Sequence, residues 1–283
     1  MQKQLFYYRH LYILAFKPKR VNVRYMTLRR FEGKRILITG GAGGIGGQIA
    51  RQFAEQGGRV GILDSNGSAI ESIVSEIVTS GAVATGEQVD VRDQIAVEQA
   101  TNKIANTLGG IDVLVTAAGG SLGTPRNLEE ISSADLDLVL DVNIKGTFNC
   151  AKSVIPFMKN AGGGSIITFS SIGGRSASPV TGVPYAAATA AILGLTRRLA
   201  KEVGEFNIRV NAIAPGLFLT DRLEGMFNQM SAAERSEVLT AIPLGRMPTL
   251  KECADPVLFL ASEESSYITG IVLDVNGGRL MPN

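Results

Sequence analysis

The feature that most constrains the fold of this chain is an alternation of short apolar runs with longer amphipathic stretches, beginning near residue 26. Strands that alternate with helices favour a parallel sheet covered by helices on both faces. The expected strands are 35–39, 59–64, 82–89, 112–117, 165–170, 209–214 and 271–275. The expected helices are 45–57, 68–80, 93–108, 133–160, 184–204 and 251–261. We therefore predict an α/β fold with one doubly wound parallel sheet of about seven strands.

Length and composition are consistent with one domain of this kind. The chain has 283 residues, of which 45% are apolar and 19% charged, an ordinary balance with ample material for a core. Segment 217–247 interrupts the alternation and is rich in Met, Leu and Phe. We expect this segment to be a mobile cap over a site near the carboxyl ends of the strands. The predicted domain is 26–283, including the cap.

The first 25 residues have a different character. They hold six basic residues and no acidic ones, mixed with aromatic residues and without a helical or strand period. We expect a basic extension that is disordered or not native, because the sequence from Met26 reads as a complete domain start. An organellar presequence and a basic membrane-surface arm are the alternatives. A secretory signal fits poorly, because the apolar run 11–16 is short.

Charge, cysteine and histidine usage argue against several classes of function. The net charge is +2, but residues 1–25 carry +6 and the remainder carries −4, so we expect no nucleic-acid partner. No stretch approaches the roughly 20 apolar residues of a membrane span. Cys150 and Cys253 lack a CxxC partner, which predicts no metal site and fits a cytoplasmic, reducing compartment. His10 is the single histidine, so a histidine-based mechanism is not expected.

A glycine-rich loop follows the first expected strand, in the pattern T-G-x-x-x-G-x-G over residues 39–46. Gly40 permits a tight turn, while Gly44 and Gly46 leave room for a pyrophosphate beside the N–H groups that begin the next helix. Glycine also serves ordinary turns, but here a strand precedes the loop and a helix follows it. The pattern therefore predicts a Rossmann-type dinucleotide site.

Asp64, at the end of the second expected strand, lies 24 residues after Gly40. A carboxylate there can accept hydrogen bonds from both hydroxyls of an adenosine ribose, and it would repel a 2′-phosphate. No Arg or Lys lies in the glycine loop or at Ser65 or Asn66 to bind such a phosphate. We therefore expect NAD(H) to be preferred over NADP(H); the alternative is that Asp64 only ends the strand.

Further motifs follow in a fixed order along the chain. They are Asp90-Val91, Thr116-Ala117-Ala118-Gly119, Asn143 in DVNIKG, Ser171 in TFSSIGG, Tyr185, and NAIAPG over 211–216 followed by Thr220. With the glycine loop, they resemble the short-chain dehydrogenase/reductase family over residues 28–283, nearest to its 3-oxoacyl reductase-like group. The resemblance implies three catalytic residues, Asn143, Ser171 and Tyr185. It also implies that the cofactor is bound by Gly40, Gly44, Ile45, Gly46, Asp64, Asp90, Val91, Ala118, Gly119, Pro215, Gly216 and Thr220.

One catalytic position departs from the family pattern. The family has Y-x-x-x-K, whereas this chain has Tyr185 followed four residues later by Thr189. Residues four apart share a helix face, so the family's lysine lies beside the tyrosine, lowers its pKa and binds ribose hydroxyls. Threonine is neutral and too short for either role. Lys145 is expected on a different helix face from Asn143, and Arg175 either replaces the missing cation or faces solvent.

By the same resemblance, the reaction is hydride transfer between nicotinamide and the carbon of a ketone or secondary alcohol. Ser171 would hydrogen-bond the substrate oxygen, and Tyr185 would exchange a proton with it. A tyrosine of reference pKa about 10 is ionised in about one molecule in a thousand at neutral pH. Reduction needs the phenol and oxidation the phenolate, so loss of the lysine is expected to impair oxidation more. The alternative is a catalytically weak or inactive NAD-binding protein, a sensor or partner subunit.

Two further expectations concern assembly and substrate. The run 186–194 is made almost wholly of small residues, which let helices approach closely, so we expect a homotetramer; a monomer that buries this face is the alternative. The cap has apolar side chains, which favour a small carbonyl or alcohol substrate with a hydrophobic or acyl group. The alternative is that these side chains only pack the cap onto the body of the domain. These are Phe218, Leu219, Leu223, Met226, Phe227 and Met230.

Overall fold

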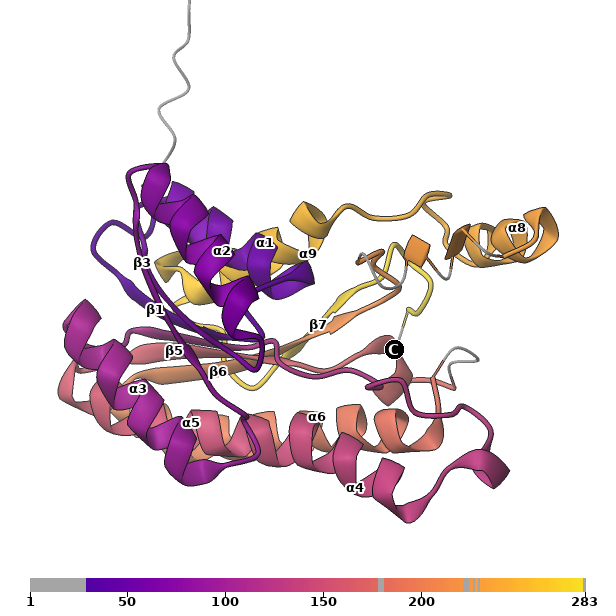
Figure 1. Cartoon of the computed structure of the whole chain (residues 1–283), viewed down its shortest axis with the longest axis horizontal. Coiled ribbons are helices and arrows are strands. Elements are labelled where there is room, and N and C mark those ends of the chain that lie inside the picture. The colour runs from indigo at the N-terminus through magenta and orange to yellow at the C-terminus, as the bar shows by residue number, and fades with distance from the viewer. Residues whose placement is uncertain (1–28, 178–180, 221–223, 226, 229, 282–283) are drawn as a thin grey trace, which may run out of the picture.

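The computed structural model describes residues 29–281 except 178–180, 221–223, 226 and 229 (Figure 1). Its centre is one wholly parallel sheet with the strand order β3-β2-β1-β4-β5-β6-β7. The strands are β1 (Arg35–Thr39), β2 (Arg59–Asp64), β3 (Val83–Gln88), β4 (Val113–Thr116), β5 (Gly164–Phe169), β6 (Ile208–Pro215) and β7 (Val272–Val275). The predicted doubly wound sheet is confirmed. The predicted extension, residues 1–25, lies outside the described residues.

The strand order places a reversal at the middle of the sheet. From β1 the chain winds outward to β2 and β3, and it then returns to pair β4 with the other side of β1. The helices after β1 and β4 therefore leave to opposite faces of the sheet, and a crevice opens between the carboxyl ends of these two strands. In open α/β sheets this is where ligands bind.

Helices cover both faces of the sheet (Figure 1). One layer contains α1 (Gly44–Glu55), α2 (Gly67–Thr79) and α9 (Leu250–Ala261). The other contains α3 (Gln94–Leu108), α5 (Gly146–Asn160) and α6 (Val183–Val203), with α4 (Ser133–Leu140) beside α6. None of the helices in the described part of the chain is long and apolar enough to cross a membrane.

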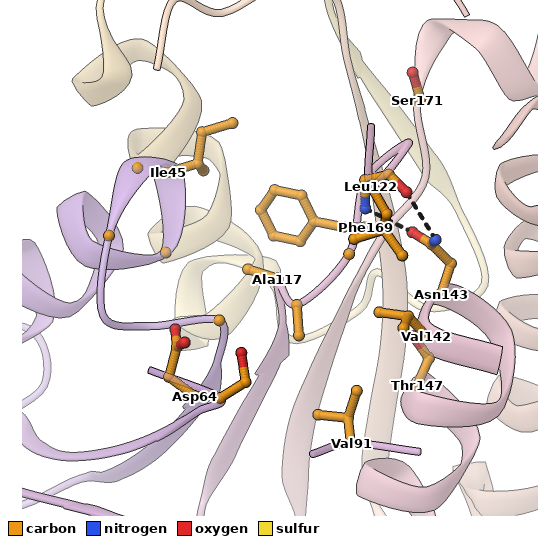
Figure 2. Close-up of a pocket in the computed structure, with 18 of the residues that line it drawn as sticks. Ile45, Asp64, Val91, Ala117, Leu122, Val142, Asn143, Thr147, Phe169 and Ser171 are labelled. Carbon is orange, nitrogen blue, oxygen red and sulfur yellow. Dashed lines mark hydrogen bonds between the residues drawn. The ribbon is translucent and has the colours of Figure 1, made fainter. Parts of the chain in front are cut away.

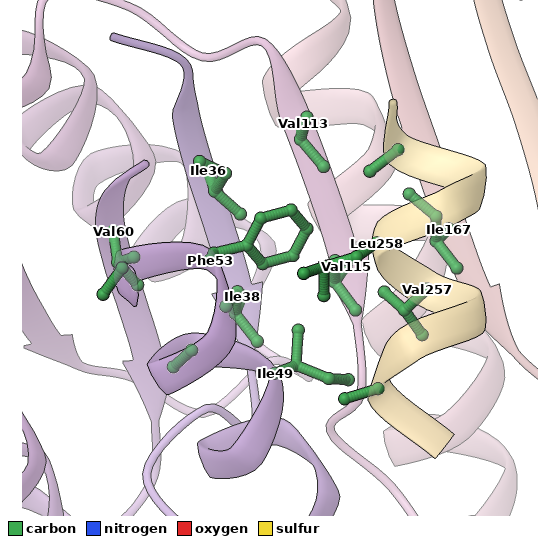
Figure 3. Close-up of a cluster of buried hydrophobic side chains, with 14 of the residues drawn as sticks. Ile36, Ile38, Ile49, Phe53, Val60, Val113, Val115, Ile167, Val257 and Leu258 are labelled. Atoms are coloured by element: carbon green, nitrogen blue, oxygen red, sulfur yellow. The ribbon is translucent and has the colours of Figure 1, made fainter. Parts of the chain in front are cut away.

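The central strands are apolar on both sides, as a sheet covered on both faces requires. In β1, Ile36 and Ile38 belong to the core beneath α1 and α9, whereas Leu37 belongs to the core beneath α3 and α5. Figure 3 shows the first of these cores, where the ring of Phe53 from α1 lies over β1 and faces Leu258 of α9. Burial of a side chain of this size contributes about 2–3 kcal/mol.

Both cysteines lie inside these cores. Cys150 and Cys253 are free thiols, one in each core, and burial raises the pKa of each to about 12. Each thiol therefore stays protonated near neutral pH, and the thiolate needed for nucleophilic attack does not form.

The structure departs from the predicted elements in two places. The helix expected over 133–160 is interrupted by a π-helical turn, Asp141–Lys145, in which the Gly146 N–H bonds the Asp141 carbonyl. Such a turn inserts an extra residue and is common at functional sites. In addition, α8 (Ala232–Thr240) lies in the segment predicted as a cap, where no helix is predicted.

The start of α1 differs from the starts of its neighbours. Side chains cap α2, α3, α4 and α9: those of Asn66, Asp93, Ser132 and Thr249 accept hydrogen bonds from N–H groups of the first turn. Helix α1 begins after Gly43, which has no side chain, and its first turn holds no acidic residue. The N–H groups at the start of α1 are therefore available to a ligand.

Candidate active site

A cavity of about 760 Å³ opens at the carboxyl ends of the strands (Figure 2). Its walls come from the segments that follow β1, β2, β3, β4, β5 and β6, together with the π-helical turn and the start of α6. All but one of the site residues predicted from the sequence line it. They are Gly40, Gly44, Ile45, Gly46, Asp64, Asp90, Val91, Ala118, Gly119, Asn143, Ser171, Tyr185, Pro215, Gly216 and Thr220.

The glycine loop has no room for side chains at two of its positions. Gly40 has a φ of +63°, and a Cβ there would meet the backbone of Ala118 at 2.7 Å. A Cβ on Gly46 would collide with the carbonyl oxygen of Gly40. The absent side chains bring the loop close to β4 and leave the start of α1 open to the cavity. An anionic group can bind there, because the positive end of the helix dipole and free N–H groups coincide.

The carboxylate of Asp64 is fixed between the glycine loop and the start of α2. Its Oδ2 accepts the Ala42 N–H at 3.1 Å, and its Oδ1 accepts the Asn66 N–H at 3.0 Å. Figure 2 shows Asp64 at the end of the cavity beside the loop. A carboxylate held in this way has remaining lone pairs to accept hydrogen bonds from ligand hydroxyl groups.

A second carboxylate, Asp90, lines the same end of the cavity. Hydrogen bonds from Arg92, the closest at 2.6 Å, hold the pKa of Asp90 below its usual range. Arg92 is the single cation among the described residues of the lining, and Asp90 neutralises it. The charged side chains at this end of the cavity are therefore two carboxylates and one arginine that is already paired.

The amide of Asn143 connects the π-helical turn to the loop after β4. Its Nδ2 donates to the carbonyls of Gly120 at 3.0 Å and Val139 at 2.8 Å, and its Oδ1 accepts the Gly120 N–H at 2.9 Å. The dashed lines in Figure 2 mark the reciprocal pair with Gly120. All the strong hydrogen-bonding atoms of this side chain are engaged, so the amide fastens the loop.

Ser171 and Tyr185 come to the cavity from different elements. Ser171 follows β5, is 7% exposed, and its Oγ accepts the Gly173 N–H at 3.1 Å, which leaves the hydroxyl hydrogen to donate elsewhere. Tyr185 lies in the first turn of α6. The hydroxyl of Ser170, which donates to the Thr189 carbonyl at 2.8 Å, connects the end of β5 to α6. Two hydroxyl groups that can donate a proton thus line one cavity.

Thr189 is the predicted site residue that the structure places outside the cavity lining. It is 1% exposed, and its Oγ1 donates to the carbonyl of Tyr185 at 2.8 Å. The hydroxyl is therefore occupied within the helix and faces no ligand.

Neither candidate replacement cation lines the cavity. Lys145 is exposed, and Arg175, instead of facing solvent, forms an ion pair with Asp274 of β7 at 2.9 Å.

The structure adds lining residues that the sequence analysis did not single out. Leu122, Val142, Thr147 and Phe169 are labelled around the cavity in Figure 2. The sequence held a signal for Phe169, because it stands two residues before Ser171 and residues two apart in an extended chain face the same side. Of the predicted apolar cap residues, Phe218 is 3% exposed and packs into the core as well as lining the cavity. Leu223 and Met226 are not among the described residues.

A family model described as enoyl-(acyl carrier protein) reductase matches residues 40–279. A short-chain type dehydrogenase/reductase from Sinorhizobium fredii, itself uncharacterized, is 37% identical over 255 residues, which cover 88% of this chain and 98% of the relative. The chain belongs to the short-chain dehydrogenase/reductase family. The predicted membership is confirmed.

Two further relatives of this short-chain dehydrogenase/reductase carry more specific names. A 3-oxoacyl-(acyl-carrier-protein) reductase from Thermotoga maritima is 38% identical over 252 residues, 89% of this chain and 100% of that protein. The crystal structure of a 3-oxoacyl-(acyl-carrier-protein) reductase with bound NAD from Brucella melitensis matches with a TM-score of 0.81 and 35% identity, covering 90% of this chain and 94% of that one. Members of the family are oxidoreductases that use nicotinamide cofactors.

The residues of this short-chain dehydrogenase/reductase fit such a cofactor. Two observations test the fit: helix α1 begins with uncapped N–H groups at the cavity, and the glycine loop forms a cradle that a Cβ on Gly46 would obstruct. Diphosphate oxygens need N–H donors and close approach to the backbone, and the loop provides both. The carboxylate of Asp64 lies at the position where ribose hydroxyls would be bound.

Proposed function

We propose that the protein interconverts a ketone and a secondary alcohol with NAD(H) as the cofactor. The observation that carries the proposal is that one cavity joins the glycine loop and Asp64, at one end, to Ser171 at the other (Figure 2), with Tyr185 in the same lining. A dinucleotide held at the first end would extend its nicotinamide toward the second. The substrate would be a small carbonyl or alcohol compound.

The predicted cofactor residues divide into two groups by position. The start of α1 and Asp64 would hold the diphosphate and the adenosine ribose, with Asp90 and Val91 beside the adenine. Ala118, Gly119, Pro215, Gly216 and Thr220 would hold the nicotinamide half. When bound, the cofactor supplies or accepts a hydride at the carbonyl carbon. Preference for NAD(H) is supported by the two carboxylates and the absence of an unpaired cation among the described lining residues.

Ser171 and Tyr185 would act on the substrate oxygen. The Ser171 hydroxyl hydrogen is free to bond that oxygen, because the Oγ atom already accepts from Gly173. In reduction, the phenol of Tyr185 would donate its proton to the same oxygen; in oxidation, the phenolate would remove it. Asn143 would hold the loop of Gly119 and Gly120 against the bound nicotinamide by its bonds to Gly120.

A second candidate function follows from Thr189. Without the lysine that the family has one turn after this tyrosine, oxidation near neutral pH would be slow, because little phenolate is present. A catalytically weak NAD-binding protein, serving as a sensor or partner subunit, is therefore the alternative. Reduction suffers less, since the phenol is its active form, and this asymmetry is why we favour the enzyme.

We further propose a cytoplasmic homotetramer. Helix α6 exposes small residues, among them Ala187, Ala190 and Gly194, and a second copy of the chain would cover them. Two buried free thiols are consistent with a reducing compartment.

The test is a fluorescence titration with NADH and NADPH, followed by a screen of ketones and secondary alcohols. We expect tighter binding of NADH, turnover of at least one ketone, and slower oxidation than reduction at neutral pH.

In Asp64→Asn the preference for NADH over NADPH should fall about tenfold, equivalent to about 1.4 kcal/mol, because the charge facing the 2′-phosphate is removed. Glu71→Gln, at an exposed position of α2, removes the same charge elsewhere and should leave the preference unchanged. Tighter NADPH binding by the wild type would contradict the cofactor assignment, and NADH binding without turnover of any substrate would favour the second function.

A further inference from the structure

The loop after β4 has an unusual backbone at the edge of the cavity. Within residues 119–123, three glycines have positive φ, and so does Leu122 at +54°. Of the described residues other than glycine, only Leu122 and Asn207 have positive φ. A leucine there is strained, because its Cβ approaches its own carbonyl oxygen. Local backbone requirements therefore do not explain why position 122 is a leucine.

A tight turn holds Leu122 in this conformation. The N–H of Thr124 donates to the carbonyl of Ser121 at 3.0 Å, and the Thr124 hydroxyl donates to the same oxygen at 2.8 Å. The two central residues of the turn, Leu122 and Gly123, both have positive φ. Turns of this type strongly favour glycine and asparagine at the two central positions. Backbone strain at a residue that lines a ligand cavity is a reason to look for a role in binding.

The two ends of the loop locate Leu122 at the reactive end of the cavity. On one side, Gly120 is bound by Asn143. On the other side, the backbone of Pro125 and Arg126 packs against Gly182, where an added Cβ would meet the Pro125 carbonyl oxygen at 2.7 Å. Gly182 precedes Tyr185 by three residues in the chain. Figure 2 likewise places Leu122 beside Asn143 and away from Asp64.

No charged residue of the described lining lies at this end of the cavity, where Leu122, Val142 and Phe169 provide apolar surface beside hydroxyl groups and the Asn143 amide. The charged residues of the described lining are Asp64, Asp90 and Arg92, which all lie at the far end, beside the glycine loop and β3. Leu122 is only half-buried, so part of its apolar surface faces the cavity. An apolar group of a ligand would remove that surface from water, whereas a charged group would find no partner among the described residues there.

We propose that Leu122 determines substrate specificity by packing against an apolar substituent of the carbonyl substrate. The proposal rests on the proposed function, because it assigns the substrate class of the same cavity. The bonds of Asn143 and Thr124 hold the strained turn so that the leucine side chain projects toward the bound substrate. The preferred substrate is then an uncharged ketone or secondary alcohol with an alkyl or aryl group next to the reacting carbon.

The test compares the wild type with Leu122→Asn, Leu122→Gly and the matched control Leu128→Asn, which changes an exposed leucine of the same connection that does not line the cavity. Asparagine and glycine tolerate positive φ, so both Leu122 variants should fold, which their melting temperatures would verify. The probes are 2-octanone and 2-butanone. One measurement is kcat/KM for their reduction with NADH, and the other is calorimetric Kd in the presence of NAD⁺, where no reduction can occur.

We expect the wild type to prefer 2-octanone in both measurements. The preference should fall about tenfold in both Leu122 variants and stay unchanged in Leu128→Asn, with NADH affinity the same in all four proteins. A wild type without preference, a Leu122 variant that keeps it, or no binding of either ketone would overturn the proposal. Preferential binding of 2-octanone without reduction of any ketone would instead contradict the proposed function and leave the role of Leu122 supported.

Discussion

Thr189 lies one helical turn after Tyr185, yet it takes no part in the cavity. Its hydroxyl donates to the Tyr185 carbonyl at 2.8 Å and to the Ala186 carbonyl at 3.3 Å, as threonine commonly does inside helices. The consequence is chemical, because the tyrosine has no cation one turn along its own helix. In the proposed reaction, this one residue is expected to slow oxidation more than reduction near neutral pH.

Thr189→Lys should raise the rate of alcohol oxidation about 100-fold or more at neutral pH. A cation beside a phenol favours the phenolate, so the pKa of the tyrosine would fall and the rise of oxidation rate with pH would move to lower pH. The measurement is kcat for oxidation between pH 6 and pH 10. Thr189→Ala removes the hydroxyl without adding charge and should give no such gain. If Thr189→Lys folds but gains nothing, the site works without this cation.

At the scale of elements, the turn from β1 into α1 shows how close packing of the backbone restricts which residue a position can hold. Gly46 is in the first turn of α1, and the carbonyl oxygen of Gly40 occupies the space where its Cβ would be. Gly43, by contrast, has an extended backbone with φ −161°, and an added Cβ would meet no protein atom within 4 Å. Close packing within the protein therefore requires glycine at position 46 but not at position 43.

Gly46→Ala should destabilise the protein by about 1–3 kcal/mol, since the backbone of the loop must shift to admit the methyl group. The same shift should weaken NADH binding, because the N–H groups at the start of α1 would move. Gly43→Ala is the matched control, and its free energy of unfolding should stay within about 0.5 kcal/mol of the wild type. Urea denaturation and NADH titration provide the two measurements. Equal effects of the two substitutions would show that the close contact at Gly46 is not the cause.

At the scale of the whole molecule, the exposed face of α6 is unusual for a helix surface. Positions 187, 190, 191 and 194 are alanine or glycine and are exposed, whereas the opposite face of the helix is buried against the sheet. Small side chains gain little from contact with water or from salt bridges, but they allow another helix to pack closely. This geometry is the basis of the proposed assembly.

Light scattering should give a mass of about four times the 30.0 kDa of one chain. Ala190→Arg should reduce that mass, because a long charged side chain would hold a second helix away from α6. Ser75→Arg, at an exposed position of α2 in the opposite layer, is the control and should leave the mass unchanged. A wild type with the mass of one chain would rule out the tetramer.

The fold itself was predictable because its signals are local. The strands β1 and β2 have the predicted bounds, and the other five differ by one residue at one or both ends. Apolar runs separated by amphipathic stretches are enough to specify a parallel covered sheet, and the T-G-x-x-x-G-x-G pattern specifies where the chain turns against a ligand. The interrupted helix at Asp141–Lys145 was not predicted, and it coincides with a contact that is not local: Asn143 bonds Gly120, which is 23 residues away.

Sequence alone therefore determined the sheet, the glycine loop and the motif residues of the cavity, since each depends on short-range pattern or motif. It did not reveal lining residues outside the motifs, such as Leu122 and Val142. It did not determine where the side chains of those residues point. That Thr189 is buried outside the cavity, that Arg175 pairs with Asp274, and that Asn143 bonds Gly120 were decided by tertiary structure. The physical reason is that hydrogen bonds and packing between distant segments select one side-chain arrangement among several that the local backbone permits.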